Sequence, residues 1–191
     1  GSPRNVRGIW ARDPDGKQHR NPMRPEHPDL DDFPMYDKAL YFDKLPGLAA
    51  EYMTTISRGC PYNCTFCFYN TVHEMVGSRK VRVRSPGNVI AELKQAREKW
   101  PQMEAVLFHD DIFPVRTSWL EEFIPLYKAE VGLPWSCITY PLLVTPRVAE
   151  LMADGGCRSV IMGVQSTNPK IRADVMERFE TNDEIHTAIR S

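Results

Sequence analysis

Three cysteines, Cys60, Cys64 and Cys67, occur within the ten-residue segment 58–67. A loop this short brings three thiolates to one place, so the fold must build a site around whatever they bind. Most protein-held iron-sulfur clusters of the 4Fe-4S type use four cysteines, and three ligands leave one iron without a protein partner. An open coordination position is typical of metal sites that carry out chemistry. The spacing therefore indicates a 4Fe-4S cluster with one accessible iron.

Two other uses of these cysteines are open from the sequence. A structural zinc site would need a fourth ligand, which His73 could supply six residues after Cys67. Zinc modules, however, usually present two separated pairs of ligands rather than one triplet. Disulfides are less favoured, because five cysteines is an odd number and tight clustering in an intracellular chain indicates metal. We expect Cys137 and Cys157 to be small buried side chains without a chemical role.

Composition limits the class of the fold and its partners. A chain of 191 residues is long enough for one sizeable core. Its 24 basic and 25 acidic residues give a formal net charge of -1, so no nucleic-acid or anionic-membrane partner is indicated. No stretch approaches the roughly 18 consecutive apolar residues that a membrane helix needs. We therefore expect a soluble, cytoplasmic protein.

The first 50 residues differ in composition from the rest. Seven of the sixteen prolines fall within the first 46 residues, among charged and few aliphatic side chains. Residues 13–16, Asp-Pro-Asp-Gly, have the composition of a tight turn and predict a small hairpin. Residues 21–46 are either an extended arm on a folded surface or a flexible linker. We expect residues 1–50 to form an N-terminal connector and residues 51–191 to form the core.

Short apolar strands alternate with amphipathic helices in that core. The strand candidates are residues 52–56, 105–109, 135–139 and 159–164. Ser85 and Thr145, each followed by proline, predict helix N-termini, and Ser118 with Glu121 has the pattern of a capping box. Helices of roughly 10 to 15 residues between strands imply parallel pairing and right-handed crossovers. The predicted fold is an α/β partial parallel barrel.

Polar residues follow each predicted strand. The cysteine loop follows the first strand, Asp110 and Asp111 the second, Tyr140 the third, and Gln165 with Ser166 the fourth. In a parallel barrel the loops after the carboxyl ends of the strands build the site. The sequence thus predicts one site at one end of the barrel.

The cysteine spacing, with an aromatic residue at Phe66 and a glycine at Gly59, resembles the signature loop of the radical S-adenosylmethionine (radical SAM) superfamily. The resemblance implies that Cys60, Cys64 and Cys67 hold a 4Fe-4S cluster whose free iron is chelated by S-adenosylmethionine. A reduced cluster then passes one electron to the cofactor, giving methionine and a 5'-deoxyadenosyl radical that removes a hydrogen atom from a small-molecule substrate. The resemblance also implies an electron donor such as flavodoxin or ferredoxin.

The same resemblance assigns the other cofactor contacts. Asp110 and Asp111 occupy the place that receives the amino group of S-adenosylmethionine, although the usual form with two glycines and a glutamate is absent. Gln165 and Ser166 occupy the place of the ribose contact, where many relatives carry glutamate. Phe66 is expected to flank the adenine, largely through its backbone.

The N-terminal segment resembles the connector of cobalamin-binding radical SAM proteins. This implies a cobalamin-dependent methyltransferase or cyclase, with cobalamin held outside this chain because no Asp-x-His-x-x-Gly motif is present. Residues 183–190 predict a helix where the family continues into further strands, so we expect an exposed strand edge and self-association through it. Two alternatives remain: a zinc-stabilised binding module, or a cluster-bearing segment without turnover.

Overall fold

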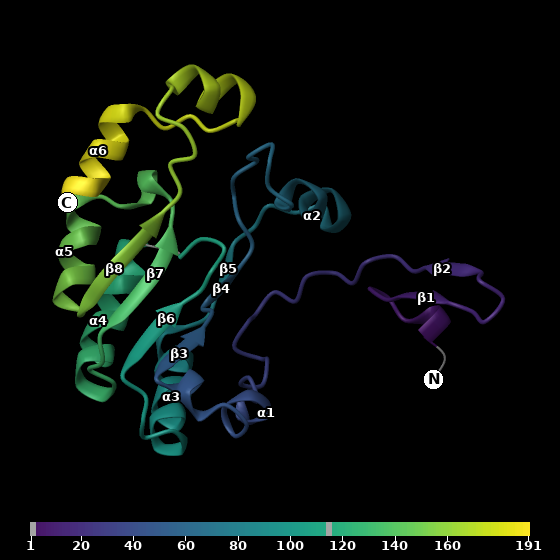
Figure 1. The fold of residues 1–191 in the computed structure, drawn as a ribbon, viewed down its shortest axis with the longest axis horizontal. Coiled ribbons are helices and arrows are strands. Elements are labelled where there is room, and N and C mark those ends of the chain that lie inside the picture. Colours follow the sequence, from purple (N-terminus) through teal and green to yellow (C-terminus); the bar gives the residue numbers. More distant parts are fainter. Residues whose placement is uncertain (1–2, 114–115) are drawn as a thin grey trace.

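A four-stranded parallel sheet forms the centre of the protein, in a computed structural model that describes residues 3–113 and 116–191. The strands lie in the order β3, β6, β7, β8, and each neighbouring pair is parallel (Figure 1). Their bounds are Glu51–Thr54 for β3, Ala105–Phe108 for β6, Trp135–Thr139 for β7 and Cys157–Met162 for β8. Strand order that follows chain order confirms the predicted α/β partial parallel barrel.

Three helices form a layer over one face of this sheet (Figure 1). They are α3 (Pro86–Lys99), α4 (Thr117–Glu130) and α5 (Pro146–Asp154), and α4 packs between the other two. The other helices are α1 (Ala39–Phe42), α2 (Tyr69–Val76) and α6 (Asn182–Arg190). Single 3-10 turns occur at Pro3–Asn5, Pro46–Ala49 and Pro141–Leu143, and a π-helical turn at Ile171–Val175. In the described ranges no helix has the length and apolar character needed to cross a membrane.

Two of the predicted helix caps are present and one is wrong. The Ser85 and Thr145 hydroxyls each accept a backbone N–H of their own first turn, at 3.2 and 3.3 Å. Helix α4, however, has Arg116 as its N-cap, without a side-chain cap, and Ser118 lies inside its first turn. The N–H of Leu120 already donates to the Arg116 carbonyl at 3.0 Å, so the helix closes before Ser118 can cap it.

The last strand of the sheet begins two residues before its predicted start. Trp135 donates its N–H to the Gly156 carbonyl at 3.2 Å and pairs with Cys157, and a register shift follows between Trp135 and Ser136. A bulge of this kind inserts a residue and lets pairing extend past the apolar run that predicted the strand. Cys157 is therefore the first residue of β8 and is half-buried, whereas Cys137 is fully buried as predicted.

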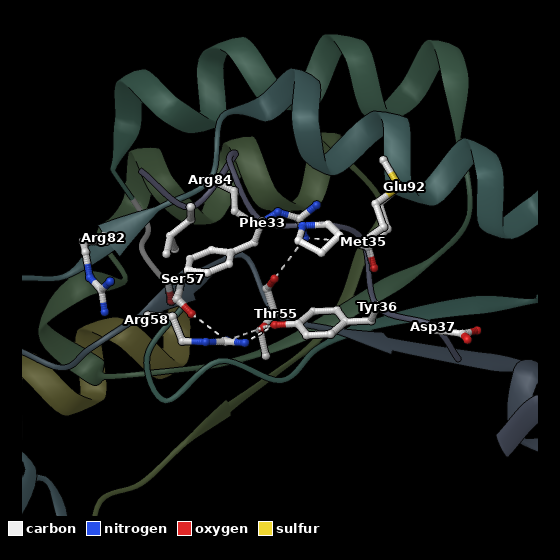
Figure 2. A pocket seen from close by; sticks show the side chains of 12 residues that line it. Phe33, Met35, Tyr36, Asp37, Thr55, Ser57, Arg58, Arg82, Arg84 and Glu92 are labelled. Atoms are coloured by element: carbon white, nitrogen blue, oxygen red, sulfur yellow. Dashed lines mark hydrogen bonds and ion pairs between the residues drawn. The ribbon is translucent and has the colours of Figure 1, made fainter. Parts of the chain in front are cut away.

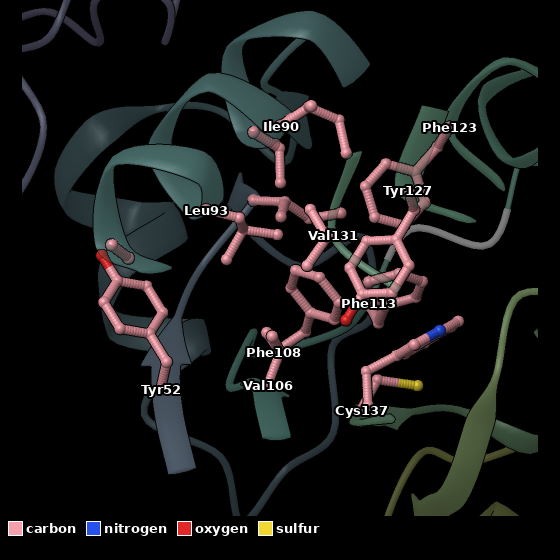
Figure 3. Close-up of a cluster of buried hydrophobic side chains, with 14 of the residues drawn as sticks. Tyr52, Ile90, Leu93, Val106, Phe108, Phe113, Phe123, Tyr127, Val131 and Cys137 are labelled. Carbon is pink, nitrogen blue, oxygen red and sulfur yellow. The ribbon is translucent and has the colours of Figure 1, made fainter. Parts of the chain in front are cut away.

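Aromatic side chains fill the core between the sheet and α4 (Figure 3). The Phe108 ring on β6 lies with its centroid 5.5 Å from that of Trp135 and 5.9 Å from that of Phe123. Tyr127 donates its hydroxyl hydrogen to the Leu133 carbonyl at 2.9 Å, so its polar end is satisfied inside the core. Burial of each large side chain contributes about 1.5–3 kcal/mol, which makes this layer the main source of stability.

The predicted hairpin lies at the end of an extended N-terminal segment, away from the sheet (Figure 1). Strands β1 (Trp10–Arg12) and β2 (Gln18–Arg20) pair antiparallel. Gly16 has φ +87°, a left-handed conformation that glycine adopts without strain, and its N–H donates to the Asp13 carbonyl at 2.9 Å. The division of the chain near residue 50 stays a prediction.

One lysine of the connector is anchored in the core. The Lys38 ammonium lies 3.6 Å from the Glu92 carboxylate and 3.5 Å from the centroid of the Tyr52 ring. Glu92, on α3, is 2% exposed and also accepts hydrogen bonds from Tyr52, Thr54 and Arg84. Burial lowers the pKa of Lys38 to about 8, although Glu92 opposes the shift. The part of the connector around Lys38 is therefore docked on β3.

Candidate functional site

The cysteine loop emerges from a two-stranded frame next to the end of β3. Strand β4 (Ser57–Arg58) pairs antiparallel with β5 (Arg82–Val83), and Gly59 follows directly. Gly59 has φ +104°, and a Cβ at this position would lie 2.6 Å from the Lys80 carbonyl oxygen. The positive φ and the close approach of the Lys80 carbonyl both disfavour a side chain at this position. The start of the loop therefore requires glycine.

The three cysteines lie on a compact turn. Cys64 is buried, and Cys60 and Cys67 are half-buried. The N–H of Cys67 donates to the Cys64 carbonyl at 2.9 Å, and the Asn70 side-chain amide donates to the same carbonyl at 3.0 Å. The loop is thus held by its own backbone and by helix α2, which follows it.

His73, the fourth ligand of the zinc alternative, makes a different contact. Its Nε2 lies 2.8 Å from the Cys60 carbonyl oxygen. A carbonyl only accepts hydrogen bonds, so Nε2 carries the hydrogen and donates it. Within the described segments no group of three or more His, Cys, Asp or Glu side chains is arranged to hold a metal ion. In this geometry His73 fixes the backbone of the cysteine loop.

Two of the three thiols favour their neutral form. Burial raises the pKa of both Cys60 and Cys64, and the neighbouring thiols and Asp111 raise that of Cys60 further. The charge of Arg178 opposes the shift at Cys64. Thiolates are the ligand form, so binding iron at these positions must release protons.

The two predicted aspartates have different environments. Asp110 is 2% exposed, and its Oδ1 accepts the N–H of Ile56 at 3.0 Å, the N–H of Ser57 at 2.6 Å and the Ser57 hydroxyl at 2.5 Å. Its Oδ2 is buried and has no hydrogen-bond partner among residues 3–113 and 116–191. Burial raises the pKa of Asp110 to about 6. Asp110 therefore ties the end of β6 to the chain that leads into the cysteine loop.

Asp111 is exposed and faces the cysteine loop. Its carboxylate accepts the hydroxyl hydrogen of Tyr69, the first residue of α2. Its negative charge also helps to raise the pKa of the Cys60 thiol. Of the two aspartates, Asp111 has the accessible carboxylate.

Gln165 has strained backbone geometry. Its φ is +69°, and the N–H of Ser166 donates to the Val164 carbonyl at 2.8 Å across it, which makes a three-residue turn. Such a turn with positive φ is rare and costly for a residue with a side chain. The Gln165 amide folds back so far that a Cβ on Gly163 would lie 2.6 Å from its Nε2. Strain of this order tends to persist where function requires it.

A stack of side chains that the sequence did not predict connects β7 to the cysteine loop. The ring of Tyr62 stacks on that of Tyr140, with centroids 4.0 Å apart and planes inclined by 22°. The Arg178 guanidinium lies 4.3 Å from the Tyr140 centroid and donates to Glu180 at 2.8 Å and to the Gly163 carbonyl at 2.5 Å. Glu180 also accepts the Tyr140 hydroxyl hydrogen. Arg178 and Glu180 lie beyond the last predicted strand end, where no motif pointed to them.

The segment after β8 closes over the same loop. Thr65 donates its N–H to the Met176 carbonyl at 3.2 Å and its hydroxyl hydrogen to the Val175 carbonyl at 2.6 Å. Asn63 donates to the Glu177 carboxylate at 3.0 Å. Phe66, near the tip of the loop, exposes 55% of its surface.

The ends of all four parallel strands thus meet at one loop. Strand β3 leads into it, and Asp110 and Asp111 after β6 bind the residues on either side of it. Tyr140 after β7 and the segment after β8 contact the loop directly. Parallel strands whose carboxyl ends converge on a three-cysteine loop define a class of barrel proteins with the site at that rim. Comparison with known proteins identifies the class.

A family model described as the Radical SAM superfamily matches residues 54–191. The chain therefore belongs to the radical SAM superfamily. It is 29% identical over 160 residues to PH0819 of Pyrococcus horikoshii, named an uncharacterized methyltransferase, covering 82% of this chain and 34% of that protein. It is 27% identical over 208 residues to a cytidylyl-2-hydroxyethylphosphonate methyltransferase of Streptomyces wedmorensis, covering 91% of this chain and 38% of that protein.

The fold also matches a solved structure. The radical S-adenosylmethionine methyltransferase TsrM of Kitasatospora setae, with tryptophan substrate and the analogue aza-SAM bound, aligns with a TM-score of 0.70 and 17% identity. The match covers 99% of this chain and 38% of TsrM. It confirms the predicted fold, and this chain spans about a third of the length of the curated relatives described above.

Proposed function

We propose that the chain binds a 4Fe-4S cluster through Cys60, Cys64 and Cys67, and S-adenosylmethionine across the neighbouring strand ends. The convergence of four strand ends on the one loop that carries three cysteines supports this most strongly. The donor set fits the cluster, because soft thiolates favour iron-sulfur centres and three of them leave one iron for the cofactor.

The environments of the predicted contacts support a division of roles. Asp111 is exposed beside the cysteine loop and can receive the ammonium group of S-adenosylmethionine. Asp110, whose Oδ1 already accepts three hydrogen bonds, positions the loop instead. Gln165 and Ser166 offer neutral donors and acceptors to the ribose, and Phe66 offers its backbone to the adenine.

The chemistry follows from the family. A cluster held by Cys60, Cys64 and Cys67 and reduced by a donor such as flavodoxin or ferredoxin would supply one electron for cleavage of the C5'–S bond of S-adenosylmethionine, which would give methionine and a 5'-deoxyadenosyl radical for hydrogen abstraction. The residues of this chain orient the cofactor, exclude water and set the charge around it. The named relatives favour methyl transfer as the overall reaction, with any cobalamin held outside these 191 residues.

Anaerobic reconstitution with iron and sulfide tests cluster binding. The loaded protein should show the broad visible absorption of a 4Fe-4S centre, and serine at Cys60, Cys64 or Cys67 should abolish it. Serine at Cys157 is the matched control and should retain it. Stoichiometric zinc without iron after anaerobic preparation would contradict the proposal and favour the zinc alternative.

Cofactor binding and turnover need their own measurements. Titration of the reduced cluster's EPR signal with S-adenosylmethionine should show about ten- to hundredfold weaker binding for Asp111→Ala, with the cluster retained. Unchanged affinity in that variant would show that Asp111 does not contact S-adenosylmethionine. Formation of 5'-deoxyadenosine in the presence of a strong reductant tests cleavage, and its absence from loaded protein would favour the alternative without turnover.

A further inference from the structure

A cavity lies between the connector and the frame of the cysteine loop. It has a volume of about 540 Å³ and is bounded by residues 30–37, the end of β3 and the β4–β5 pair. Figure 2 shows the Phe33 ring, which lines this cavity, close to the side chains of Arg58 and Arg84. Cavities of this size hold small organic molecules. The proposed cluster ligands and Asp111 do not line it.

Two arginines of the cavity occupy opposite positions in the pair of strands. Arg58 on β4 and Arg82 on β5 are direct partners in the antiparallel pair, and both line the cavity. Side chains of directly opposite residues point to the same side of the pair, and like charges in that relation are destabilising. Two positive charges on one side of a strand pair are most stable where each has an anion beside it.

Of this pair, only Arg82 has a carboxylate within ion-pair distance among the described residues. Arg82 pairs with Glu26 at 3.0 Å, and Arg84, the third arginine of the cavity, pairs with Glu92. Arg58 donates to the Thr55 hydroxyl at 2.5 Å, the Ser57 carbonyl at 3.0 Å and the Tyr36 hydroxyl, all neutral acceptors. It has no carboxylate partner among the described residues.

Arg82 also keeps a donor unused. Its Nε is buried and, in the part of the chain described, has no hydrogen-bond partner. Unsatisfied buried donors are costly, and a guanidinium presents its donors in the geometry that carboxylate and phosphate groups accept. Phe33, Pro34 and Met35 supply an apolar wall beside these groups.

We propose that this cavity binds a small organic anion, whose carboxylate or phosphate lies on Arg58 and the Nε of Arg82 and whose apolar body packs on Phe33 and Met35. The site is separate from that of S-adenosylmethionine. It joins the connector to β4, two residues before Cys60, so its ligand contacts both parts of the chain.

Three probes with one apolar body and different head groups test this site. They are 2-naphthoate, 2-naphthyl phosphate and the neutral 2-naphthamide, added to full chain labelled with 13C in the methionine methyl groups. The Met35 resonance, assigned with Met35→Leu, should shift saturably with at least one anion. The amide should bind at least tenfold more weakly. The stronger anion identifies the head group as carboxylate or phosphate.

Arg58→Gln should weaken binding of the anion until its affinity equals that of the amide. Arg147→Gln, which alters an exposed arginine on α5 at the other edge of the sheet, should bind it as the unaltered chain does. Equal binding of amide and anions to the unaltered chain, or no saturable Met35 shift at millimolar probe, would overturn the proposal even if Arg58→Gln does not fold. Probe binding is measured both before and after cluster loading. The result for this cavity is therefore obtained whether or not the chain binds a cluster.

Discussion

The aromatic ring of Tyr62, which lies between the first two cysteines, stacks on the ring of Tyr140 at the end of β7, with centroids 4.0 Å apart. The contact joins the most flexible kind of element, a loop, to a rigid strand of the sheet. We therefore expect it to hold the cysteine loop against the sheet.

Substitutions at Tyr140 separate stacking from hydrogen bonding. Tyr140→Phe keeps the stack but removes a donor from Glu180, which is 2% exposed, and should cost about 1–3 kcal/mol of unfolding free energy. Tyr140→Ala should cost more and also speed amide hydrogen exchange across residues 60–67 in the metal-free protein. Urea unfolding and exchange mass spectrometry measure the two effects. Equal loop exchange in all three proteins would show that the stack does not order the loop.

Gly59→Ala should prevent cluster loading. The added Cβ would lie 2.6 Å from the Lys80 carbonyl oxygen in a left-handed backbone, so the entry to the loop must shift. Gly87→Ala is the matched control, because Gly87 lies in α3 with open space around it, and alanine favours helix by up to about 1 kcal/mol. Iron content after reconstitution compares the two. Full iron binding by Gly59→Ala would show that the loop tolerates the shift.

Asp110 should make the stability of the metal-free protein depend on pH. Burial raises its folded pKa from 3.8 to about 6, so the folded protein holds this proton more tightly than the unfolded chain does. The stabilising contribution is present below about pH 4 and is lost as the pH rises through 6, by up to about 3 kcal/mol. Asp110→Asn cannot ionise and should therefore gain stability relative to the unaltered protein over this interval. The unfolding free energies of the two proteins are compared from pH 4 to 7. A constant difference between them over this range would contradict the assignment.

Gln165→Gly should change stability and cofactor affinity in opposite directions. Glycine relieves the strain of φ +69° and should raise the unfolding free energy by up to about 1–3 kcal/mol, less the entropy that glycine gains in the unfolded chain. The same change removes the amide that we assign to the ribose, so S-adenosylmethionine should bind about two- to tenfold more weakly. Calorimetry and EPR titration measure the two quantities. A variant that is less stable and binds S-adenosylmethionine as before would show that Gln165 has a structural role and does not bind the cofactor.

The outer edge of β8 should promote self-association. Ile161 on this strand is 53% exposed, and no described strand pairs with that edge. Ile161→Lys should reduce the concentration-dependent association seen by sedimentation velocity, because a charge on an edge strand disfavours pairing with another chain. Leu126→Lys on α4 is the control with a charge elsewhere. Identical monomeric sedimentation of all three proteins at high concentration would exclude an interface at this edge.

The sequence predicted what depends on local spacing. A few adjacent residues determine each of these features, which are the cysteine triplet, the apolar runs of the strands, and the helix caps at Ser85 and Thr145. It could not separate Asp110 from Asp111, because their different burial depends on Ser57 and Tyr69, which are distant in the chain. The stack of Tyr62 on Tyr140 was equally inaccessible, since its partners come from different strand ends.

Errors at element ends have the same origin. The capping box at Ser118 failed because the first turn of α4 closes on Arg116. Strand β8 extends back to Cys157 because a bulge beside Trp135 changes the register. Neither the tertiary position of a helix start nor a register shift leaves a periodic signal in one sequence.

The position of Glu92 on α3 also bears on the order in which the protein folds. Arg84 lies eight residues from Glu92 in sequence, so the Arg84–Glu92 ion pair can form as soon as α3 forms. Lys38 must close a far longer loop to reach the same carboxylate, and such contacts form late. Docking of the connector should therefore have low φ-values. Substitution of Lys38 should accelerate unfolding while leaving the folding rate almost unchanged.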